Sequence, residues 1–392
     1  MKKIGILTYV CVGNYGTELQ AFALERAVNC LGHDAEVIDF KYRWPSRYRK
    51  RFRYLSGFFS RLFRGEFKAI IHLSLAVLGR TTPLPVARKW TEICRRRQQR
   101  FEAFFGDTRH SAVAYTRELL YANPPLYDVF VVGSDQVWNR MFTDMLDVFF
   151  LNFVTNDSCR IAYAASIGIR SIPLSLRATY RKGLAAFHAI SIRERYGCRV
   201  VESLVDRPVA HVLDPTLLLS AEAWRKECLP VEVTSPYILL SSVTASPSLR
   251  TMALKLSEAT RIPVISLYPE HDECDRPKVI NRYDAGPREF LALVSNAALV
   301  LTDSFHSTAF AINFGVNFLA VVAAAASKRI SGRLEDLLDL VGLRDRLVVV
   351  TESLSELPPN IDYVRVHAVL AEKREQSLKW LVNSLESCAE KK

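Results

Sequence analysis

The sequence lacks a hydrophobic run long enough to cross a bilayer, which takes roughly 20 apolar residues. The best candidate, Ala69 to Leu78, is short and contains His72 and Ser74. A secretory signal is absent as well, because Ile4 to Val10 has the length of a strand and no cleavage site follows it. We therefore expect no transmembrane anchor and an N-terminus that is folded domain.

The sequence also has no C-x-x-C motif, and its eight cysteines are scattered without a histidine at metal-ligand spacing. Such a pattern is typical of reduced thiols inside the cell rather than of a disulfide framework. It predicts a cytoplasmic protein, and we expect neither a metal nor an organic cofactor.

Acidic residues are nearly missing from one part of the chain. Residues 41–100 hold 17 Lys and Arg against two acids, although the whole chain carries a net charge of only +11. Within this segment, residues 41–54 interleave cations with aromatics, and residues 58–79 predict a helix with one apolar side. Two interpretations stay open: a solvated insertion packed on its own domain, or a surface at residues 41–79 that binds an anionic membrane. No recognition motif accompanies the charge, so we expect no nucleic acid partner.

What is present is a regular alternation of short Val- and Ile-rich runs with helical patterns, in both halves of the chain. A chain of 392 residues exceeds what one hydrophobic core usually organises. The pattern predicts an α/β protein of two Rossmann-like, doubly wound domains facing a cleft. We place an N-terminal domain at 1–207 with the basic aromatic insertion at 41–125, and a C-terminal domain at 208–362. A last helix, 363–392, would pack back on the N-terminal domain.

Polar clusters follow four of the predicted strands, where an α/β sheet places its ligands. They are Gly13-Asn-Tyr-Gly16, Gly133-Ser-Asp-Gln-Val-Trp138, Ser191-Ile-Arg-Glu194 and Asp303-Ser-Phe-His306. A helix begins after the last cluster, and its N-terminus could hold an anion. The pair Asp214-Pro215, by contrast, predicts a turn.

In these stretches the sequence resembles the polysaccharide pyruvyl transferase family. The resemblance extends through residues 13–22, 128–139, 161–168, 190–194, 213–218, 303–307 and 327–330, and omits about residues 41–125. It implies a two-domain fold similar to that of GT-B glycosyltransferases, with the acceptor on the N-terminal side and the donor on the C-terminal side. It also implies transfer of the enolpyruvyl group of phosphoenolpyruvate onto two sugar hydroxyls, giving a pyruvate ketal in a surface polysaccharide such as a capsule or exopolysaccharide.

The resemblance implies a donor site as well. In the family an Arg-Leu-His triplet and an Arg in a Ser-x-Arg-Asp/Glu motif hold the donor; here Arg193 and His306 match, while the triplet arginine is replaced by Ser304. The candidates for the missing cation are Arg195, Lys328 and Arg329, and Ser307 completes the donor set. Ketal formation needs an acid for the methylene carbon, which we leave open among His306, Glu194 and Asp303.

On the acceptor side, the candidates for sugar contact are Asn14, Tyr15, Asp135, Gln136 and Trp138. An indole can stack on a sugar face, and a buried tryptophan beside a capping aspartate is an interpretation almost as good. If residues 41–79 bind a membrane, the acceptor is a lipid-linked saccharide and the enzyme lies on the inner face of that membrane. Two other functions stay open: a glycosyltransferase that uses a nucleotide sugar, and a non-catalytic saccharide-binding protein.

Overall fold

The structure is a computed structural model that describes most of the chain outside the basic segment. The described residues are 1–10, 13–41, 85–139, 145–155, 157–233, 236–244, 246–267, 279–322, 332–349 and 356–388, with side chains of the helix at 85–107 from residue 91 onward. Several expectations concern residues outside these ranges. They are the helix at 58–79, nearly all of the proposed membrane surface at 41–79, and the cations Lys328 and Arg329.

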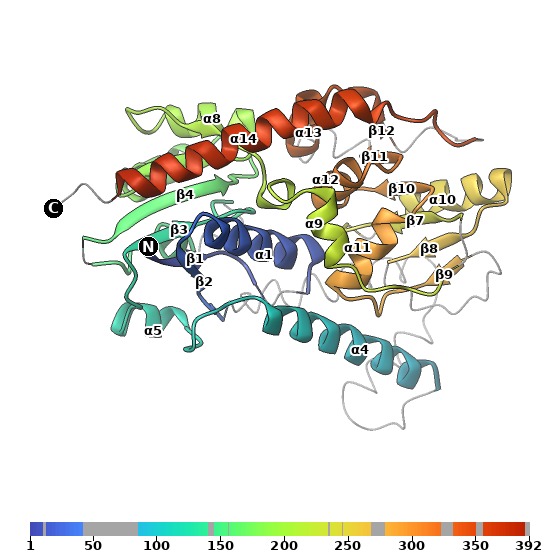
Figure 1. The fold of residues 1–392 in the computed structure, drawn as a ribbon, viewed down its shortest axis with the longest axis horizontal. Helices are drawn as coiled ribbons and strands as arrows, with labels where there is room; N and C mark the ends of the chain where they lie inside the picture. The colour runs from blue at the N-terminus through green and yellow to red at the C-terminus, as the bar shows by residue number, and fades with distance from the viewer. Residues whose placement is uncertain are drawn as a thin grey trace.

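The N-terminal half builds a parallel sheet of six strands in the order β2-β1-β3-β4-β5-β6 (Figure 1). Its strands are β1 (Lys3–Leu7), β2 (Asp34–Val37), β3 (Val129–Val132), β4 (Cys159–Ala165), β5 (Ala189–Ile192) and β6 (Ala210–His211). Its helices are α1 (Tyr15–Cys30), α4 (Pro85–Asp107), α5 (Arg117–Ala122), α6 (Leu146–Phe149), α7 (Leu174–Ala185) and α8 (Arg195–Glu202). Because β6 pairs with β5, this sheet extends past the expected boundary at 207.

The C-terminal half builds a second parallel sheet of six strands, in the order β12-β11-β10-β7-β8-β9. Its strands are β7 (Ile238–Ser241), β8 (Val264–Ser266), β9 (Val279–Asn281), β10 (Leu299–Thr302), β11 (Phe318–Val322) and β12 (Leu347–Val349). Its helices are η2 (Pro215–Leu217), α9 (Ala221–Lys226), α10 (Pro247–Thr260), α11 (Pro287–Ser295), α12 (Phe305–Phe314), α13 (Gly332–Val341) and η3 (Arg344–Arg346), followed by α14 (Tyr363–Ser387). The expected fold class, two doubly wound α/β domains, is confirmed.

Each sheet has one place where the direction of strand addition reverses. In the first sheet it lies between β1 and β3, where Leu7 pairs with Val132; in the second it lies between β7 and β10, where Ser241 pairs with Thr302. Loops diverge at such a reversal, so it leaves a crevice at the carboxyl ends of the strands. Three of the four polar clusters found in the sequence follow β1, β3 and β10, and therefore meet at these two points.

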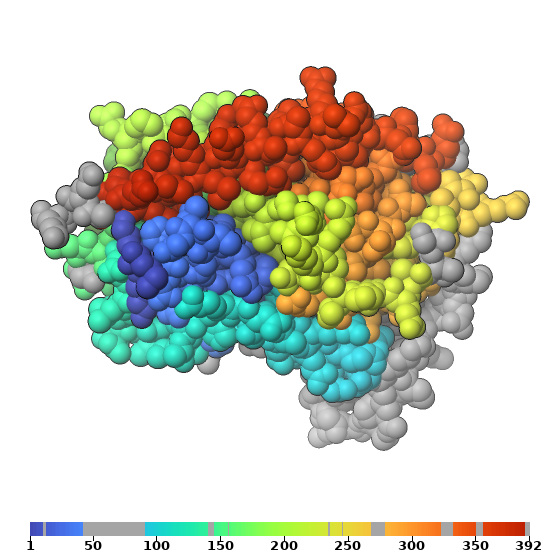
Figure 2. All heavy atoms as spheres, in the orientation of Figure 1, coloured from blue at the N-terminus to red at the C-terminus, as the bar shows by residue number. Residues whose placement is uncertain are grey.

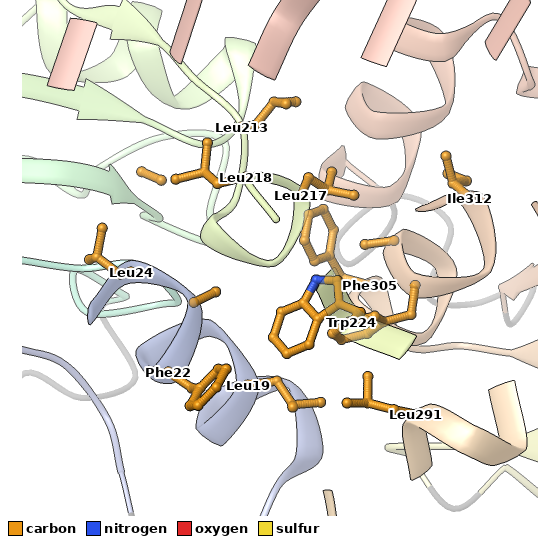
Figure 3. Packing of buried hydrophobic residues seen from close by; sticks show 14 of the residues in the cluster. Leu19, Phe22, Leu24, Leu213, Leu217, Leu218, Trp224, Leu291, Phe305 and Ile312 are labelled. Carbon is orange, nitrogen blue, oxygen red and sulfur yellow. The ribbon is translucent and has the colours of Figure 1, made fainter. Parts of the chain in front are cut away.

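An apolar cluster joins the two domains (Figure 3). Phe22 of α1 contacts Trp224 of α9, with ring centroids 5.8 Å apart, and Tyr15 of α1 stacks on Phe290 of α11 at 4.5 Å. Trp224 is fully buried, and its indole N–H donates to the Thr216 carbonyl oxygen. Burying one large apolar side chain contributes roughly 1.5–3 kcal/mol of stability. The buried aromatic rings between the domains therefore hold the two halves together as a core would.

Two long helices run across both halves, α4 along one side and α14 along the other (Figures 1 and 2). On α4, Phe104 contacts Phe22 of the N-terminal domain, while Arg100 forms ion pairs with Asp284 and Glu289 of the C-terminal domain. On α14, the Trp380 ring lies 6.1 Å from the Tyr163 ring of β4. These contacts place the C-terminal end of α14 on the N-terminal sheet.

The end of α14 is held to that sheet by a covalent bond. Cys388 forms a disulfide with Cys159 at the start of β4, and the side chain of Ser387 lies 2.9 Å from Nε2 of His188. The expectation that all cysteines are reduced is therefore wrong for this pair, because the fold brings together two residues 229 positions apart. Spacing along the sequence could not show this.

Among the described residues, no helix combines the length and the apolar character that crossing a bilayer requires.

We predict that Cys159→Ser lowers the free energy of unfolding by about 2–4 kcal/mol, because the disulfide closes a very long loop and so restricts the unfolded chain. Urea unfolding of protein purified without reductant measures the change. Cys30→Ser is the matched control, since Cys30 is an exposed free thiol. A wild-type midpoint that does not respond to added reductant would contradict the prediction.

Candidate active site

A buried ion pair lies at the centre of the crevice. Arg193, one residue after β5, places its Nη1 atom 2.7 Å from Oδ2 of Asp214, which follows β6. The Arg193 side chain is 2% exposed and that of Asp214 is fully buried. Neighbouring parallel strands deliver the two residues to the same edge of the sheet, so the pair follows from the register of β5 and β6.

Further hydrogen bonds fix the carboxylate of Asp214. Its Oδ1 atom accepts from both the backbone N–H and the hydroxyl of Thr216, and its Oδ2 atom accepts from the hydroxyl of Ser134 at 3.0 Å. Burial alone would raise the pKa of Asp214, but His306 and Arg193 outweigh it and hold the pKa far below its usual range. Asp214 is therefore negatively charged at neutral pH, and it also caps the turn that the Asp-Pro pair predicted.

His306 comes to this pair from the other domain. It lies in the first turn of α12, and its Nε2 atom is 3.6 Å from Oδ2 of Asp214 and 3.5 Å from Nη1 of Arg193. The imidazole packs directly on Gly16, where an added Cβ atom would be only 2.0 Å from Nδ1 of His306. A side chain at position 16 would displace the histidine, which explains the glycine at the start of α1.

Arg193 has donors to spare. Its Nε and Nη2 atoms are buried without a hydrogen-bond partner, although Nη2 lies 3.6 Å from Oδ1 of Asp135. Phe305 covers one face of the guanidinium, with 4.3 Å between Cζ and the ring centroid. Buried donors without partners cost free energy, and they are retained where a ligand satisfies them. The arrangement can therefore receive an anion.

Glu194 lies beside Arg193 and is also buried. Its Oε1 atom accepts from the hydroxyl of Ser166 and from the backbone N–H groups of Ile167 and Gly168, while Oε2 has no hydrogen-bond partner. Burial raises the pKa of Glu194 more than Arg193 and these donors lower it. A carboxyl group in such a place holds its proton to higher pH and can deliver it.

The remaining residues of the last polar cluster stabilise the loops around the crevice. Asp303 accepts hydrogen bonds from Ser242, from the Val243 N–H and from Thr244, so both of its oxygens serve the loop after β7. Ser304 is the N-cap of α12 and accepts from the N–H of Ser307. The position that carries an arginine in the family triplet thus caps the helix here. The hydroxyl of Ser307 pairs with that of Ser241 at 2.9 Å.

Of the expected acceptor residues, two stay near the crevice and three have other contacts. Asp135 accepts from the hydroxyl of Thr17, and the half-buried Gln136 accepts from Asn139. Asn14 caps α1, and Tyr15 donates to the Ala285 carbonyl oxygen in the domain interface. Trp138 is fully buried and donates to the Phe149 carbonyl oxygen, so its indole lies in the core and offers no face to a sugar.

Two important residues were missed by reasoning from the sequence. Asp214 was interpreted only as a turn residue, although an acid directly after a predicted strand was the available signal. Arg333, at the start of α13, lies near Arg193, Asp135 and Glu194; burial and the charge of Arg193 lower its pKa. Within the described part of the chain, no carboxylate forms an ion pair with Arg333. The expected cation Arg195 is exposed on α8.

One group of described residues has donor atoms close enough for a metal ion. These are Cys159, His188 and Cys388, whose donor atoms lie within 4.8 Å of one another. They lie at the amino end of β4, away from the crevice, and the disulfide leaves neither sulfur as a thiolate.

Fold and site together define a two-domain α/β protein with a buried charged centre between its domains. A model of the family described as polysaccharide pyruvyl transferase matches residues 14–323. The chain belongs to this family. No curated protein sequence matches it at a significant level.

Several solved structures of low sequence identity match the fold. UDP-GlcNAc 2-epimerase of Methanocaldococcus jannaschii is 14% identical over 98% of this chain and 99% of that one, with a TM-score of 0.48. The UDP-GlcNAc 2-epimerase of Neisseria meningitidis is 11% identical over 99% and 100%, with a TM-score of 0.46. UGT89C1 of Arabidopsis thaliana, complexed with quercetin, is 13% identical over 100% and 96%, with a TM-score of 0.40. At these scores the similarities carry no argument about the chemistry of this site.

We predict that Asp214→Asn lowers the free energy of unfolding by about 3–5 kcal/mol at neutral pH, because it removes the nearest and fully buried counter-charge of Arg193. The pKa of Asp214 is lowered in the folded state, so the ionised carboxylate stabilises the fold. This stabilisation is complete above the ordinary aspartate pKa of about 3.9 and is lost progressively as the pH falls below that value. The difference between wild type and variant should therefore shrink in acid. Urea unfolding of both proteins at about one-unit intervals between pH 3 and pH 7 tests this.

Asp339→Asn serves as the control for a surface ion pair, because Asp339 and its partner Arg344 are both half exposed. We expect it to change stability by less than about 1 kcal/mol. Equal losses for Asp214→Asn and Asp339→Asn would contradict a central role for the buried pair.

Proposed function

We propose that the protein transfers the enolpyruvyl group of phosphoenolpyruvate onto two hydroxyls of a saccharide, forming a pyruvate ketal during surface polysaccharide biosynthesis. The observation that carries the proposal is the buried Arg193, which retains two donor atoms without hydrogen-bond partners beside His306 of the other domain. Family membership gives the reaction its general class, polysaccharide pyruvyl transfer. Phosphoenolpyruvate as the donor fits a site that can receive an anion.

The charges of the site bear on how the donor is held. Asp214 already balances Arg193, so a donor with a phosphate and a carboxylate needs a further cation. Arg333 is suited to this role, since it lies near Arg193 and has no ion-pair partner among the described residues. Each charge-assisted contact to the donor contributes on the order of 1.5–3 kcal/mol. Arg333 then serves in place of the arginine that Ser304 replaces.

The chemistry requires one proton at the methylene carbon of the donor and the loss of one proton from each of two sugar hydroxyls. Two carbon–oxygen bonds form, and the bond to phosphate breaks. Of the two protons released, one balances that on the methyl group and the other leaves with phosphate. Glu194 is the best placed acid, because its pKa is raised by burial and its Oε2 atom is unoccupied. Asp303 is excluded from this role by its hydrogen bonds to the loop.

The other two groups complete the assignment. His306 would contact the departing phosphate, because its Nε2 atom lies in the centre, 3.5 Å from Nη1 of Arg193. Asp135 would accept the proton of the attacking hydroxyl, because it lies at the rim of the crevice and faces Arg193. Gln136, the next residue, is half-buried and would contact the saccharide.

We predict that the wild-type protein, incubated with phosphoenolpyruvate and a panel of saccharides, releases phosphate and gives a product heavier by one pyruvate less one water. Arg193→Ala and Arg333→Ala should each reduce kcat/KM for phosphoenolpyruvate by roughly 10- to 100-fold, because each removes a charge-assisted contact. Glu194→Gln should reduce kcat by on the order of 10²–10⁴-fold. Since Glu194 must be protonated to act, the wild-type rate should fall as the pH rises through its raised pKa, and Glu194→Gln should lack this dependence.

The exposed Arg344, which pairs with Glu335 and Asp339, offers a control, and Arg344→Ala should leave kcat/KM within about twofold. Turnover of a nucleotide sugar without phosphoenolpyruvate would identify a glycosyltransferase instead. Saccharide binding without any turnover would identify a non-catalytic relative.

We further propose that residues 41–79 bind an anionic membrane and that the acceptor is lipid-linked; the basic charge of the segment supports this, although it lies largely outside the described residues. We expect the intact protein to float with liposomes that contain anionic lipid, and a deletion of residues 46–80 to stay in the soluble fraction. Neutral liposomes are the control. Equal recovery of the two proteins would refute the proposal.

A further inference from the structure

A second hollow lies on the N-terminal domain between α7, α8 and the loop after β4. Its volume is about 340 Å³, which is within the range of small-ligand sites. Its lining consists of Arg170, Ser171, Ile172, Arg177, Tyr196, Arg199, Val200, Ser203 and Leu204. The lining therefore holds three arginines and no acid, which gives it a single sign of charge.

The arginines are only partly neutralised by their neighbours. Arg170 pairs with Glu335 at 2.8 Å, but Glu335 is shared with Arg344 at 3.2 Å. Arg177 donates to the Ser203 carbonyl oxygen, which is neutral. Within the described part of the chain, Arg199 has no carboxylate at ion-pair distance. The hollow thus keeps a net positive charge that only a ligand or counter-ions can balance.

The hollow adjoins the active site through two elements of its wall. Tyr196 lines it and lies two residues after Glu194; an added Cβ on Gly332, the neighbour of Arg333, would be 2.8 Å from the Tyr196 ring. The N–H of Gly168, two residues before Arg170, donates to Glu194. The hollow and the proposed proton donor therefore share two chain segments, 168–170 and 194–196.

We propose that this hollow binds a diphosphate group carried by the acceptor saccharide. Guanidinium groups match phosphate oxygens in geometry as well as in charge, and several arginines around a hollow of this size suit a diphosphate better than a single carboxylate. Tyr196 in the lining and Glu194 belong to the same chain segment, so the saccharide would extend from phosphates bound here to the proposed proton donor. This inference rests on the proposed function for the identity of the acceptor, while the binding of the anion itself does not depend on turnover.

Titration calorimetry with inorganic pyrophosphate tests the anion site. Arg177→Ala and Arg199→Ala should each weaken binding by about tenfold, the factor of one charge-assisted contact, and the double variant more. Arg181→Ala is the matched control, since Arg181 is exposed on α7 one turn from Arg177 and does not line the hollow. Its affinity should equal that of the wild type. Equal affinities of the double variant and Arg181→Ala would overturn the proposal.

Inhibition of turnover distinguishes an acceptor-borne diphosphate from a free anion. We expect pyrophosphate to compete with the saccharide and not with phosphoenolpyruvate, and the double variant to lose this inhibition. Competition with phosphoenolpyruvate alone, or with neither substrate, would overturn the assignment to the acceptor. If pyrophosphate binding depends on Arg177 and Arg199 but phosphoenolpyruvate is never consumed, the anion site stands and the proposed function fails. If phosphoenolpyruvate is consumed but substitution of Arg177 and Arg199 changes neither turnover nor its inhibition, the proposed function stands and the acceptor site fails.

Discussion

The buried ion pair of Arg193 and Asp214 is the interaction on which the rest of the site depends. Two charges removed from water are stable only when geometry and hydrogen bonds compensate for the lost hydration. Here Thr216 and Ser134 fix the carboxylate, and Phe305 covers the guanidinium. Because the carboxylate stays ionised, the arginine keeps a fixed position with donors available to a ligand. His306 completes the centre only while the second domain is docked.

Docking of the domains is ensured mainly by apolar contacts. The cluster around Phe22 and Trp224 continues one core into the other, and the helices α4 and α14 add contacts on two sides. Gly16 permits the closest approach, since the imidazole of His306 occupies the space of a side chain there. The geometry of the proposed site is therefore a property of the interface, and a change in domain packing would change the position of His306 relative to Arg193.

The two sheets show how far sequence patterns extend. Strands such as β3 and β10 are continuous apolar runs, and the alternation with helices was sufficient to predict their class. The short edge strands β9 and β12 have three residues each, too few for a periodic signal. Helix α4 was not predicted, because its many arginines obscured the apolar side on which Phe104 contacts Phe22. The disulfide between Cys159 and Cys388 likewise depends on where α14 ends.

The sequence by itself determined the two-domain α/β class, the family, and the positions of Arg193, Glu194 and His306, because strand periodicity and strand-end motifs are local. Only the tertiary structure decided what surrounds those residues. It showed that Asp214 is negatively charged at neutral pH, that Ser304 and Asn14 cap helices, that Trp138 belongs to the core, and that Arg333 lies near Arg193. The physical reason is that a charge, a cap or a buried ring is defined by its neighbours in space, and these come from strands and domains far apart in the chain.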